Sequence, residues 1–584
     1  MSLNIKRRVS DNAPFFSSSL HPVIQSIYSG RGITSADQIK RKAGELLPVN
    51  SLKGISDATP ILFDALKQQS HITIVGDFDA DGATSTALMM LGLRKLGFEN
   101  VAYKVPNRFD YGYGLSPELA ADVISQGTDI VITVDNGISC LAGVDLVKQA
   151  GIKVIVTDHH LAGRELPNAD AIINPNQPDC EFESKNLAGV GVAFYLLLGL
   201  RAYMRDQGWY ENHQIAAPNL AEFIDLVALG TVADVVKLDE NNRILVHQGL
   251  ARIKSGLCRP GIRAMLAMSN KDLHKVKSSD FGFVIGPRLN AAGRLDDMSF
   301  GIRCLLTDDY GQALKMAEDL NDLNNERKDI EQGMRLEAES VVSKLKVLDG
   351  ALPNGISVYK PDWHQGVIGI VAGRLKEKYY RPTIAFAKGE TKTDSSGQTS
   401  TELKGSARSI PGIHIRDVLD EVNTRYPNII IKFGGHAMAA GLSIREDHYD
   451  EFNRAFDAVL LNHLSEDVLT QVTLTDGELP AECFTTDFSQ QLDLAGPWGQ
   501  GFPEPTFDGQ FEVINQRLVG AKHLKLVLCN AAGQLFDAIH FNTDLELWPN
   551  PNARQVHIVY QLDINEFRGN TNLQLLVREI VAAD

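Results

Sequence analysis

The sequence predicts an α/β protein with a parallel-sheet domain, a long connecting helix, a second, smaller α/β domain and a C-terminal β-barrel. Three observations support this prediction. Short β-branched runs alternate with helical patterns between residues 71 and 176, helix formers fill residues 311–346, and residues 466–584 hold short alternating strands. The length of 584 residues exceeds one ordinary domain, and three or four are expected at about 150 residues each.

The composition limits the class of protein. The chain carries 57 basic and 73 acidic residues, a net charge of −16. This balance argues against a surface that coats DNA or lipid throughout, but it leaves room for a local basic groove. No apolar run reaches about 18 residues, so no membrane span is expected. The N-terminus lacks the apolar core of a secretory signal, and the six cysteines form no CxxC pair, so we expect free thiols and a cytoplasmic protein.

The first sheet is expected between residues 71 and 176. The predicted strands lie at 72–78, 101–105, 129–135, 153–158 and 171–175, and the predicted helices at 83–97 and 141–151. Strand–helix repeats whose strands are apolar on both faces are typical of a parallel sheet covered by helices. Ligands of such sheets bind outside the carboxyl ends of the strands.

Residues 311–346 have apolar side chains at helical spacing, and a continuous helix there would be about 54 Å long at about 1.5 Å per residue. A second α/β unit follows at about 355–463, with glycine-rich turns expected near residues 405 and 434. Residues 466–584 show short strands separated by turn residues, which predicts a small barrel or sandwich.

Acidic residues follow the first strand. Asp77, Asp79 and Asp81 occupy alternate positions just before a predicted helix. Crowded carboxylates repel one another unless a cation neutralises them, so this arrangement predicts a metal site. Taken alone, the motif is explained about equally well as an acidic turn or a helix N-cap.

Further polar residues follow the other strands of the predicted sheet. Asp135 ends the strand at 129–134, Asp158-His159-His160 ends the next, and Asp234 ends the apolar segment 223–236, which we also place at the carboxyl edge. Imidazole and carboxylate ligands suit first-row ions, and mainly carboxylate sites accept Mg²⁺. The number of ligands exceeds the need of one ion, so two metals about 3.5–4 Å apart are expected.

Four of these motifs resemble those of the DHH phosphoesterase superfamily. They are GDFDADG (76–82), VDNG (134–137), TDHH (157–160) and GTVADVV (230–236). Within the superfamily, the chain is similar from end to end to the RecJ family of bacterial single-strand-specific 5′ exonucleases. The further matching segments are PRLNAAGRLDD (287–297), LNDLNNERK (320–328), WHQGVIGIVAGRL (363–375), GSARS (405–409) and GGHAMAAG (434–441).

The resemblance implies a role for each metal ligand. Asp79 and Asp135 would hold one ion, Mn²⁺ or Mg²⁺, with Asp77 close by. The second ion would be held by Asp81, Asp135, His159 and Asp234, with Asp135 bridging the two. The soluble pyrophosphatases of the superfamily carry a histidine where this chain has Val75, which leaves the ligands of the first ion less defined.

The resemblance also implies the reaction. A water between the two ions would attack the phosphate in line, so no covalent nucleophile is needed. His160 would face the scissile phosphate, and Asp158 and His436 complete the expected catalytic set. The product would be 5′-mononucleotides released in the 5′-to-3′ direction during DNA recombination and repair.

Substrate-binding residues are expected in three places. Ser406 and Arg408, with Arg108, would hold the terminal 5′ phosphate, although a polar loop is the better explanation of the segment 404–409 when it is taken alone. The glycine-rich turn at Gly434 and Gly435 strengthens the phosphate interpretation. Residues on the segment 287–294 would contact the DNA backbone, unless they only form a salt-bridged helix start; they are Arg288, Asn290 and Arg294.

The C-terminal region resembles an OB-fold, which often binds single strands through basic and aromatic side chains. Arg517, Lys522, His523 and Lys525 are the basic candidates. For most of the nearby phenylalanines, at 511, 536, 541 and 567, a place in the barrel core is preferred. Trp498 is expected to pack at a domain junction rather than to stack on a base.

The predicted domains are an arm at 1–45, the DHH domain at 46–304, the connecting helix at 305–346, a DHH-associated domain at 347–463 and the OB-like domain at 466–584. A small-substrate DHH phosphoesterase is the first alternative, and a non-catalytic DNA-binding scaffold of the Cdc45 type is the second. Expected partners are single-stranded DNA with a 5′ end, a single-strand-binding protein and a RecQ-type helicase. A monomer that binds no membrane is expected.

Overall fold

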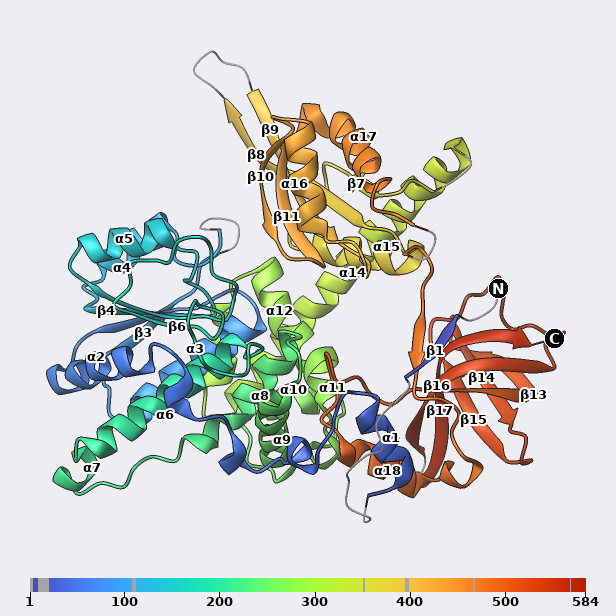
Figure 1. The fold of residues 1–584 in the computed structure, drawn as a ribbon, viewed down its shortest axis with the longest axis horizontal. Coiled ribbons are helices and arrows are strands. Elements are labelled where there is room, and N and C mark those ends of the chain that lie inside the picture. Colours follow the sequence, from blue (N-terminus) through green and yellow to red (C-terminus); the bar gives the residue numbers. More distant parts are fainter. Residues whose placement is uncertain are drawn as a thin grey trace. The chain divides into compact units, whose positions relative to one another are not determined.

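The computed structural model describes residues 4–8, 20–107, 112–349, 352–393, 399–465, 468–567 and 569–583. It divides into two compact units, which are described separately (Figure 1). The first unit comprises Met1–Asn321 and Thr473–Asp584, and the second comprises Asp322–Val472.

The first unit contains the predicted parallel sheet. Its five strands lie in the order β3-β2-β4-β5-β6, and every neighbouring pair is parallel. The strands are β2 (Ile72–Val75), β3 (Val101–Lys104), β4 (Ile130–Val134), β5 (Lys153–Thr157) and β6 (Ala171–Ile173). All side chains of β2 and β4 are buried because helices cover both faces. The prediction of the sheet is confirmed.

Helices cover both faces of this sheet (Figure 1). The helices on one face are α4 (Pro117–Ser125) and α5 (Leu141–Gln149), and those on the other are α2 (Ile55–Gln68), α3 (Ala80–Lys95) and α6 (Gly189–Asp206). Valine side chains of β4 and β5 pack with Leu119, Val123, Val144 and Val147 of α4 and α5 in one buried cluster.

A helical layer follows the sheet along the chain. It contains α8 (Ile224–Ala233), α9 (Glu240–Lys254), α10 (Pro260–Met268), a π-helical turn η6 (Phe281–Ile285), α12 (Gly286–Leu295) and α13 (Ser299–Leu306). The placement of Asp234 at a strand end was therefore wrong, since it follows α8. Residues 224–231 of α8 are buried on every side, and such a helix has the same unbroken apolar sequence as a buried strand.

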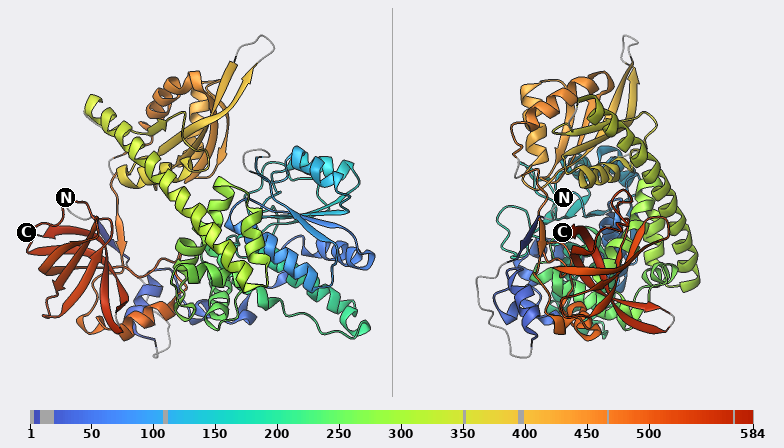
Figure 2. Two further views of the ribbon diagram at one scale, coloured as in Figure 1. Left: turned by 180° about the vertical axis from the view of Figure 1, so that it is seen from behind. Right: turned by 90° about the vertical axis from the view of Figure 1, so that its right-hand side faces the viewer.

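The predicted long helix is confirmed as α14 (Tyr310–Asp349), one unbroken helix of 40 residues (Figure 2). The second unit also contains a five-stranded sheet in the order β10-β11-β9-β8-β7. Its strands are β7 (Ile356–Tyr359), β8 (Thr383–Thr393), β9 (Thr399–Arg408), β10 (Ile430–Gly435) and β11 (Ala439–Arg445). Its other helices are α15 (Ile368–Tyr379), α16 (Ile415–Arg425) and α17 (Tyr449–Leu460).

Of the two glycine-rich turns predicted near 405 and 434, the first was wrong, since Gly405 lies inside β9. The second is confirmed within two residues, because β10 ends at Gly435 and residues 436–438 turn the chain into β11. A Cβ at Gly405 would lie 2.5 Å from the ring of Phe386 on β8, so the glycine is required by close strand packing and not by a turn.

The C-terminal region of the first unit forms the predicted closed barrel, in the order β13-β14-β15-β17-β16. The strands are β13 (Phe507–Val519), β14 (His523–Cys529), β15 (Leu535–His540), β16 (Gln555–Phe567) and β17 (Asn570–Ala583). The helix α18 (Thr486–Ala495) precedes the barrel and was not predicted.

The N-terminal residues pack against this C-terminal region. The strand β1 (Ile5–Arg7) pairs in parallel with β12 (Thr473–Thr475), and the hydroxyl of Tyr28 on α1 (Pro22–Ser29) donates to the backbone oxygen of Ala495. Trp498 is buried and stacks on Phe502, with ring centroids 5.0 Å apart, which agrees with a packing role.

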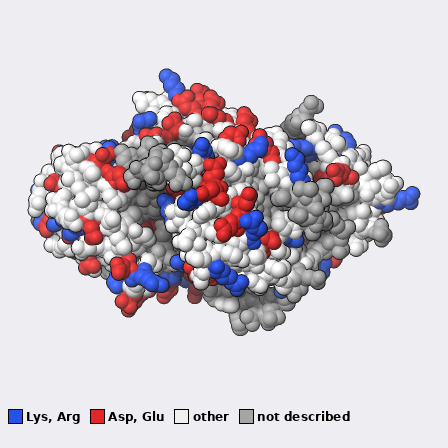
Figure 3. All heavy atoms as spheres, turned by 90° about the horizontal axis from the view of Figure 1, so that it is seen from above, with Lys and Arg blue, Asp and Glu red and all other residues white. Residues whose placement is uncertain are grey.

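The surface reflects the mixed charge of the chain. On the face drawn in Figure 3, acidic and basic side chains are interspersed over the coloured residues. No helix within the described ranges is long and apolar enough to cross a membrane.

Candidate metal centre

The first acidic motif forms the turn between β2 and α3. Asp79 is the N-cap of α3, and its Oδ1 accepts hydrogen bonds from the backbone N–H groups of Asp81 (2.9 Å) and Gly82 (3.0 Å). The N-cap explanation is therefore correct for Asp79. It does not exclude a ligand, because neither bond uses the second carboxylate oxygen.

Asp81 lies in the first turn of α3 and is fully buried. Its two carboxylate oxygens accept hydrogen bonds from the first turn of α6, from the N–H of Gly189 (2.6 Å) and the N–H of Val190 (3.0 Å). The positive end of a helix dipole stabilises a carboxylate at such a position. Two helices therefore fix Asp81, since α3 carries it and α6 binds its carboxylate.

Asp135 follows β4 with a left-handed backbone, φ +60°. Non-glycine residues seldom adopt this conformation, which costs about 1–3 kcal/mol and persists only where the surroundings enforce it. The α6 backbone at Gly189 lies so close that a Cβ there would be 2.6 Å from the Cβ of Asp135. The hydroxyl of Tyr113 also donates to the backbone oxygen of Asp135 (3.1 Å).

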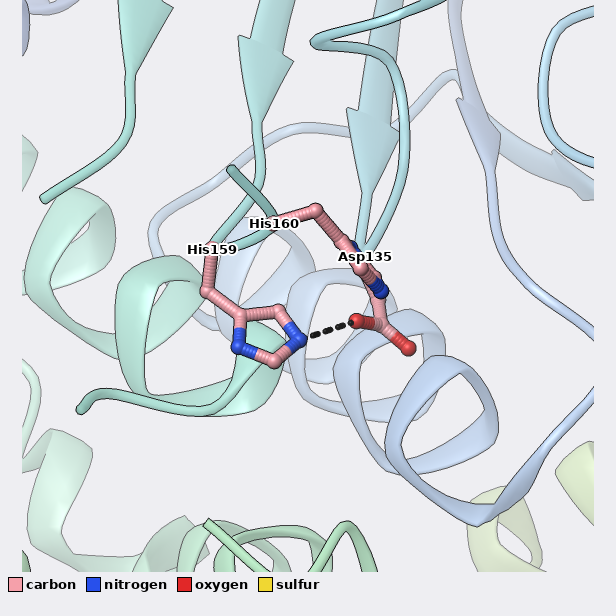
Figure 4. A group of neighbouring side chains, drawn as sticks. All are labelled: Asp135, His159 and His160. Atoms are coloured by element: carbon pink, nitrogen blue, oxygen red, sulfur yellow. Dashed lines mark ion pairs between the residues drawn. The ribbon is translucent and has the colours of Figure 1, made fainter. Parts of the chain in front are cut away.

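His159 lies among three of the acidic side chains, and Figure 4 shows its ring facing the carboxylate of Asp135. Its Nε2 lies 3.1 Å from Oδ1 of Asp135, 3.5 Å from Oδ2 of Asp234 and 4.0 Å from Oδ2 of Asp81. Ligand atoms also converge in three overlapping groups, each within 4.8 Å. The groups are Asp77 with Asp79 and Asp135, Asp81 with His159 and Asp234, and Asp135 with His159 and His160. The structure thus brings together all six side chains that the sequence predicted as metal ligands.

The protonation equilibria of these groups reflect crowded negative charge. Burial, strengthened by neighbouring carboxylates, raises the pKa of Asp135 and of Asp234 above its usual range and raises the pKa of Asp81 to about 7. Burial lowers the pKa of His159 to about 4, so its imidazole is neutral at pH 7. A divalent cation among these groups would relieve the repulsion between the carboxylates.

Buried polar atoms without a hydrogen-bond partner indicate whether these residues suit a cation. Oδ1 of Asp135 and Nε2 of His159 are both buried and form no hydrogen bond within the described part of the chain, although they face each other at 3.1 Å. The His159 ring donates a hydrogen bond to the backbone of Leu187, which leaves the lone pair of Nε2 directed at the carboxylates. A neutral imidazole nitrogen among carboxylate oxygens is a donor set suited to Mn²⁺, and the carboxylates alone would accept Mg²⁺.

Asp158 has a different role from the other aspartates. Its Oδ1 accepts from the N–H groups of His159 (2.7 Å) and His160 (3.0 Å) and lies 2.7 Å from Nδ1 of His160, while its Oδ2 accepts from the N–H of Ile138 (2.9 Å). Burial lowers the pKa of His160, but the hydrogen bond to Asp158 outweighs it and raises the pKa to about 9. The His160 side chain is 36% exposed against 12% for His159, so it is the protonated group at the mouth of the site.

Two asparagines that the sequence analysis did not select hold the histidine backbone. Nδ2 of Asn174 donates to the backbone oxygen of His160 (2.9 Å), and Nδ2 of Asn176 donates to that of His159 (2.6 Å). Both residues follow β6. The sequence signal was present, since Asn-Pro-Asn ends the fifth strand at the edge where the ligands gather.

The segment proposed to contact the DNA backbone forms α12 and packs on the metal loop. Oδ1 of Asn290 accepts the N–H of Ala80 (2.8 Å) at the start of α3. Arg288 donates to the backbone oxygen of Val284 (2.7 Å) and to Oδ1 of Asn321 (2.9 Å). Both terminal nitrogens of Arg288 and Oδ1 of Asn290 thus already have partners in the protein, and Arg294 lies on the same helix. Arg108 lies outside the described residues.

In the second unit, Ser406 and Arg408 lie on β9 and not on the loop that the sequence suggested. Nη1 of Arg408 donates to Oγ of Ser406 (3.1 Å) and to the backbone oxygen of Ala407 (2.8 Å). Burial lowers the pKa of Arg408. The first turn of α15 lies against this pair, since a Cβ at Gly369 would be 2.8 Å from Nη2 of Arg408 and 2.9 Å from Oγ of Ser406.

A row of glycines continues from this pair across the second sheet. Ser406 of β9 is in register with Gly441 of β11, and Gly441 with Gly434 of β10. A Cβ at Gly434 or Gly441 would have no described atom within 4 Å, so the sheet surface is open there. The neighbouring Gly435 has φ +142° and precedes His436, whose N–H donates to the backbone oxygen of Ala439 (2.8 Å).

Three protein families match consecutive parts of the chain. Residues 71–231 match the DHH family, N-terminal domain, residues 352–462 match the DHHA1 domain, and residues 475–579 match the RecJ OB domain.

Curated relatives match the chain over nearly its whole length. The single-stranded-DNA-specific exonuclease RecJ of Salmonella typhimurium is 52% identical over 99% of this chain and 98% of its own length. The protein of the same name from Escherichia coli is 51% identical over 99% of both chains.

Solved structures give the same result at lower identity. The crystal structure of RecJ from Thermus thermophilus in complex with Mn²⁺ has a TM-score of 0.77, with 28% identity over 97% of this chain and 76% of that chain. The Mg²⁺ complex from the same organism has a TM-score of 0.71, with 27% identity over 97% of this chain and 75% of that chain.

Proposed function

The chain belongs to the RecJ family of single-stranded-DNA-specific exonucleases, and from this premise we propose that it hydrolyses single-stranded DNA from the 5′ end to 5′-mononucleotides with the help of two divalent ions. The observation that carries the proposal is the buried contact of His159 with Asp135 and Asp234, which brings one imidazole and two carboxylates together without hydrogen bonds between them. Its role in the cell would be DNA recombination and repair.

The ligand set divides into two groups around one shared residue. Asp79 and Asp135, supported by Asp77, would hold the first Mn²⁺ or Mg²⁺, and Asp81, Asp135, His159 and Asp234 would hold the second. The support is the convergence of these side chains within 4.8 Å in overlapping groups. When bound, the divalent ions would neutralise the phosphate oxygens and lower the pKa of a water for in-line attack.

His160 would act on the phosphate directly. Its hydrogen bond to Asp158 raises its pKa to about 9, so at pH 7 it is a cation that can donate a hydrogen bond to a phosphate oxygen. Asp158 would fix the orientation of this ring, because its carboxylate also binds the backbone at positions 159 and 160. In this scheme Asp158 positions His160 and binds no metal.

The terminal 5′ phosphate would bind on the second unit, at Ser406 and Arg408. A guanidinium beside a hydroxyl and the first turn of a helix supplies the charge and the donors that a phosphate needs. The open glycine row at Gly434 and Gly441 would admit the sugar-phosphate backbone without steric conflict. Arg108, Gly435 and His436 are assigned to the same substrate by resemblance to the family.

The barrel would bind the strand further along. Phe541 is 50% exposed and lies beside His523, with ring centroids 5.1 Å apart, whereas Phe511 and Phe536 are buried in the barrel core. An exposed aromatic ring near Lys522 combines a stacking surface with positive charge, as single-strand binding requires. The single-strand-binding protein, the RecQ-type helicase, the monomeric state and the cytoplasmic location stay predictions from the family and the sequence.

The decisive experiment digests 5′-labelled and 3′-labelled oligonucleotides, single-stranded and duplex, with Mn²⁺, Mg²⁺ or a chelator. We expect loss of the 5′ label first, single strands only, and no digestion with chelator. Asp135→Asn and His159→Ala should be inactive, while Asp145→Asn, a matched change on the exposed side of α5, should be fully active.

Three results would refute the parts of the proposal separately. Hydrolysis by Asp135→Asn at the wild-type rate would show that the proposed metal centre is not needed for catalysis. Release of the 3′ label first would refute the proposed 5′-to-3′ direction. Equal digestion of duplex would refute the proposed selectivity for single strands. Arg408→Ala, assayed on the same substrates, should blur the preference for the 5′ end, and an unchanged preference would move the phosphate site elsewhere.

A further inference from the structure

Tyr113 is a half-exposed aromatic residue that contacts both Asp135 and His160 at the metal centre. Its hydroxyl donates to the backbone oxygen of Asp135 (3.1 Å) and lies 3.4 Å from both ring nitrogens of His160. Its ring meets the rings of His160 and Phe78 edge-on, with centroids 5.9 Å and 6.0 Å away. The side chain nevertheless keeps 46% of its surface exposed, so it borders solvent at the mouth of the site.

The backbone around Tyr113 is shaped to place it there. Gly112 and Gly114 have φ +78° and +65°, conformations that other residues rarely adopt. A Cβ at Gly114 would lie 2.8 Å from Sγ of Cys140 and 3.2 Å from Oδ1 of Asn136, so the loop is also pressed against the end of β4. Two glycines with left-handed backbones therefore lay one tyrosine against the residue that follows β4.

The hydroxyl has a specific electrostatic role. A tyrosine O–H has one proton to donate, and here the proton goes to the carbonyl of Asp135, so its lone pairs are left for His160. Asp135 has a left-handed backbone, a conformation that the surroundings must enforce. The hydrogen bond holds the carbonyl of that residue, while Gly189 of α6 lies against its Cβ. The hydroxyl also lies at the edge of the His160 ring, 3.4 Å from each of its two nitrogens.

We propose that Tyr113 is a positioning residue of the metal centre, whose hydroxyl fixes the backbone of the shared ligand Asp135 and the edge of His160. The proposal rests on the proposed metal-dependent function, because Asp135 is assigned there to both ions. The alternative is a residue that only packs its ring on Phe78. Removal of the hydroxyl distinguishes the two, since packing needs the ring and positioning needs the O–H.

The test compares Tyr113→Phe with the wild-type full-length chain, using calorimetric titration with Mn²⁺ alone. Loss of one hydrogen bond that organises a ligand should weaken Mn²⁺ binding about three- to ten-fold. The unfolding temperature without metal should fall only slightly, because one hydrogen bond is lost while the ring and its contacts remain. The single-turnover rate on single-stranded DNA at saturating Mn²⁺ should also fall, with little change in the DNA concentration needed for half-maximal rate.

Tyr310→Phe is the matched control. Tyr310 is 39% exposed and contacts Arg263 through its ring face, far along the sequence from the metal ligands. The same loss of a hydroxyl there should leave Mn²⁺ affinity at the wild-type value.

Two outcomes would overturn the proposal. One is an Mn²⁺ affinity of Tyr113→Phe that differs from wild type by less than about two-fold, since a hydrogen bond of ordinary strength is worth more. The other is a Tyr113→Phe chain that is unfolded without metal at the assay temperature, which would make the hydroxyl a general stabilising contact. A wild-type chain that binds Mn²⁺ but degrades no single-stranded DNA would refute the proposed function while leaving the Mn²⁺ comparison valid.

Discussion

Replacing Gly293 with alanine should disable the metal centre from a position that holds no ligand. Gly293 lies on α12 where that helix crosses the metal loop, and a Cβ there would be 1.7 Å from the backbone oxygen of Phe78. The oxygen belongs to the main chain between Asp77 and Asp79 and cannot rotate away. Either α12 or the metal loop must move.

The size of the movement follows from the same contact. Real Cβ atoms essentially never approach a heavy atom within 3.0 Å, so the two segments must separate by at least 3.0 − 1.7 = 1.3 Å. The hydrogen bond from the N–H of Ala80 to Oδ1 of Asn290 joins the same two segments and is 2.8 Å long. After the separation it would be about 4 Å long, which is beyond hydrogen-bond range. Strain together with one lost hydrogen bond costs about 2–4 kcal/mol of unfolding free energy. A displacement of about 1 Å at a catalytic site lowers the rate on the order of 100-fold.

The assay measures urea unfolding and single-strand hydrolysis of Gly293→Ala and of Gly282→Ala. Gly282 lies in the neighbouring π-helical turn, where a Cβ would meet only Cγ1 of Val232 at 3.8 Å, an ordinary contact. The control should therefore keep wild-type activity and gain up to about 1 kcal/mol, since alanine is the better helix former. If Gly293→Ala hydrolyses DNA at the wild-type rate and is as stable as the control, α12 does not position the metal loop and the reasoning is wrong.

Further predictions concern the supports of the site and of the barrel. Burial raises the pKa of Asp508, but hydrogen bonds, led by those from Arg7, outweigh it and lower the pKa, so the contribution of this carboxylate to stability is present above the ordinary pKa of an aspartate and lost as pH falls through the lowered pKa. Asp508→Asn should flatten that part of the curve of unfolding free energy against pH, and an unchanged slope would contradict this. Asn176→Ala removes the hydrogen bond to the backbone of His159 and should weaken Mn²⁺ binding about five-fold by calorimetry; equal affinity would show that the carbonyl needs no support. Chelation should abolish hydrolysis with no change in far-UV circular dichroism, because Asp81 keeps its bonds to α6; loss of helix signal would contradict this.

The sequence was sufficient to predict the sheet and the set of ligands. Strands buried on both faces give unbroken apolar runs, and the polar residues that end them must meet at one edge of a parallel sheet. Asp77, Asp79, Asp135 and His159 could be assigned to one site for this reason. The apolar pattern of the strands and the positions of these polar residues were enough to predict a shared site, without knowledge of side-chain conformation.

The errors in the prediction share a physical cause. Asp234 was placed after a strand because α8 is buried on all sides and shows no amphipathic period. Ser406 was placed in a loop because glycine favours turns, whereas here Gly405 makes room for Phe386 on the adjacent strand. Both cases depend on tertiary neighbours, which local patterns do not contain.

The supporting residues were missed for a second reason. Asn176 and Tyr113 act through single hydrogen bonds to backbone oxygens of the ligands. Such bonds leave no spacing rule in a sequence, since the partner is a carbonyl that every residue possesses. They can be found only from coordinates.

The backbone distinguishes among aspartates that the sequence presents as equal. Asp79 and Asp81 together accept four backbone N–H groups from α3 and α6, so the fold holds both carboxylates in place. Asp135 and Asp234 accept no backbone N–H to their carboxylates in the described part of the chain, and His159 lies between them. A bound cation would therefore gain most of its binding energy from Asp135 and Asp234, while Asp79 and Asp81 are already held in place before it binds. Substitution of Asp81 should consequently lower the stability of the metal-free chain, whereas substitution of Asp135 should relieve repulsion there and remove metal binding.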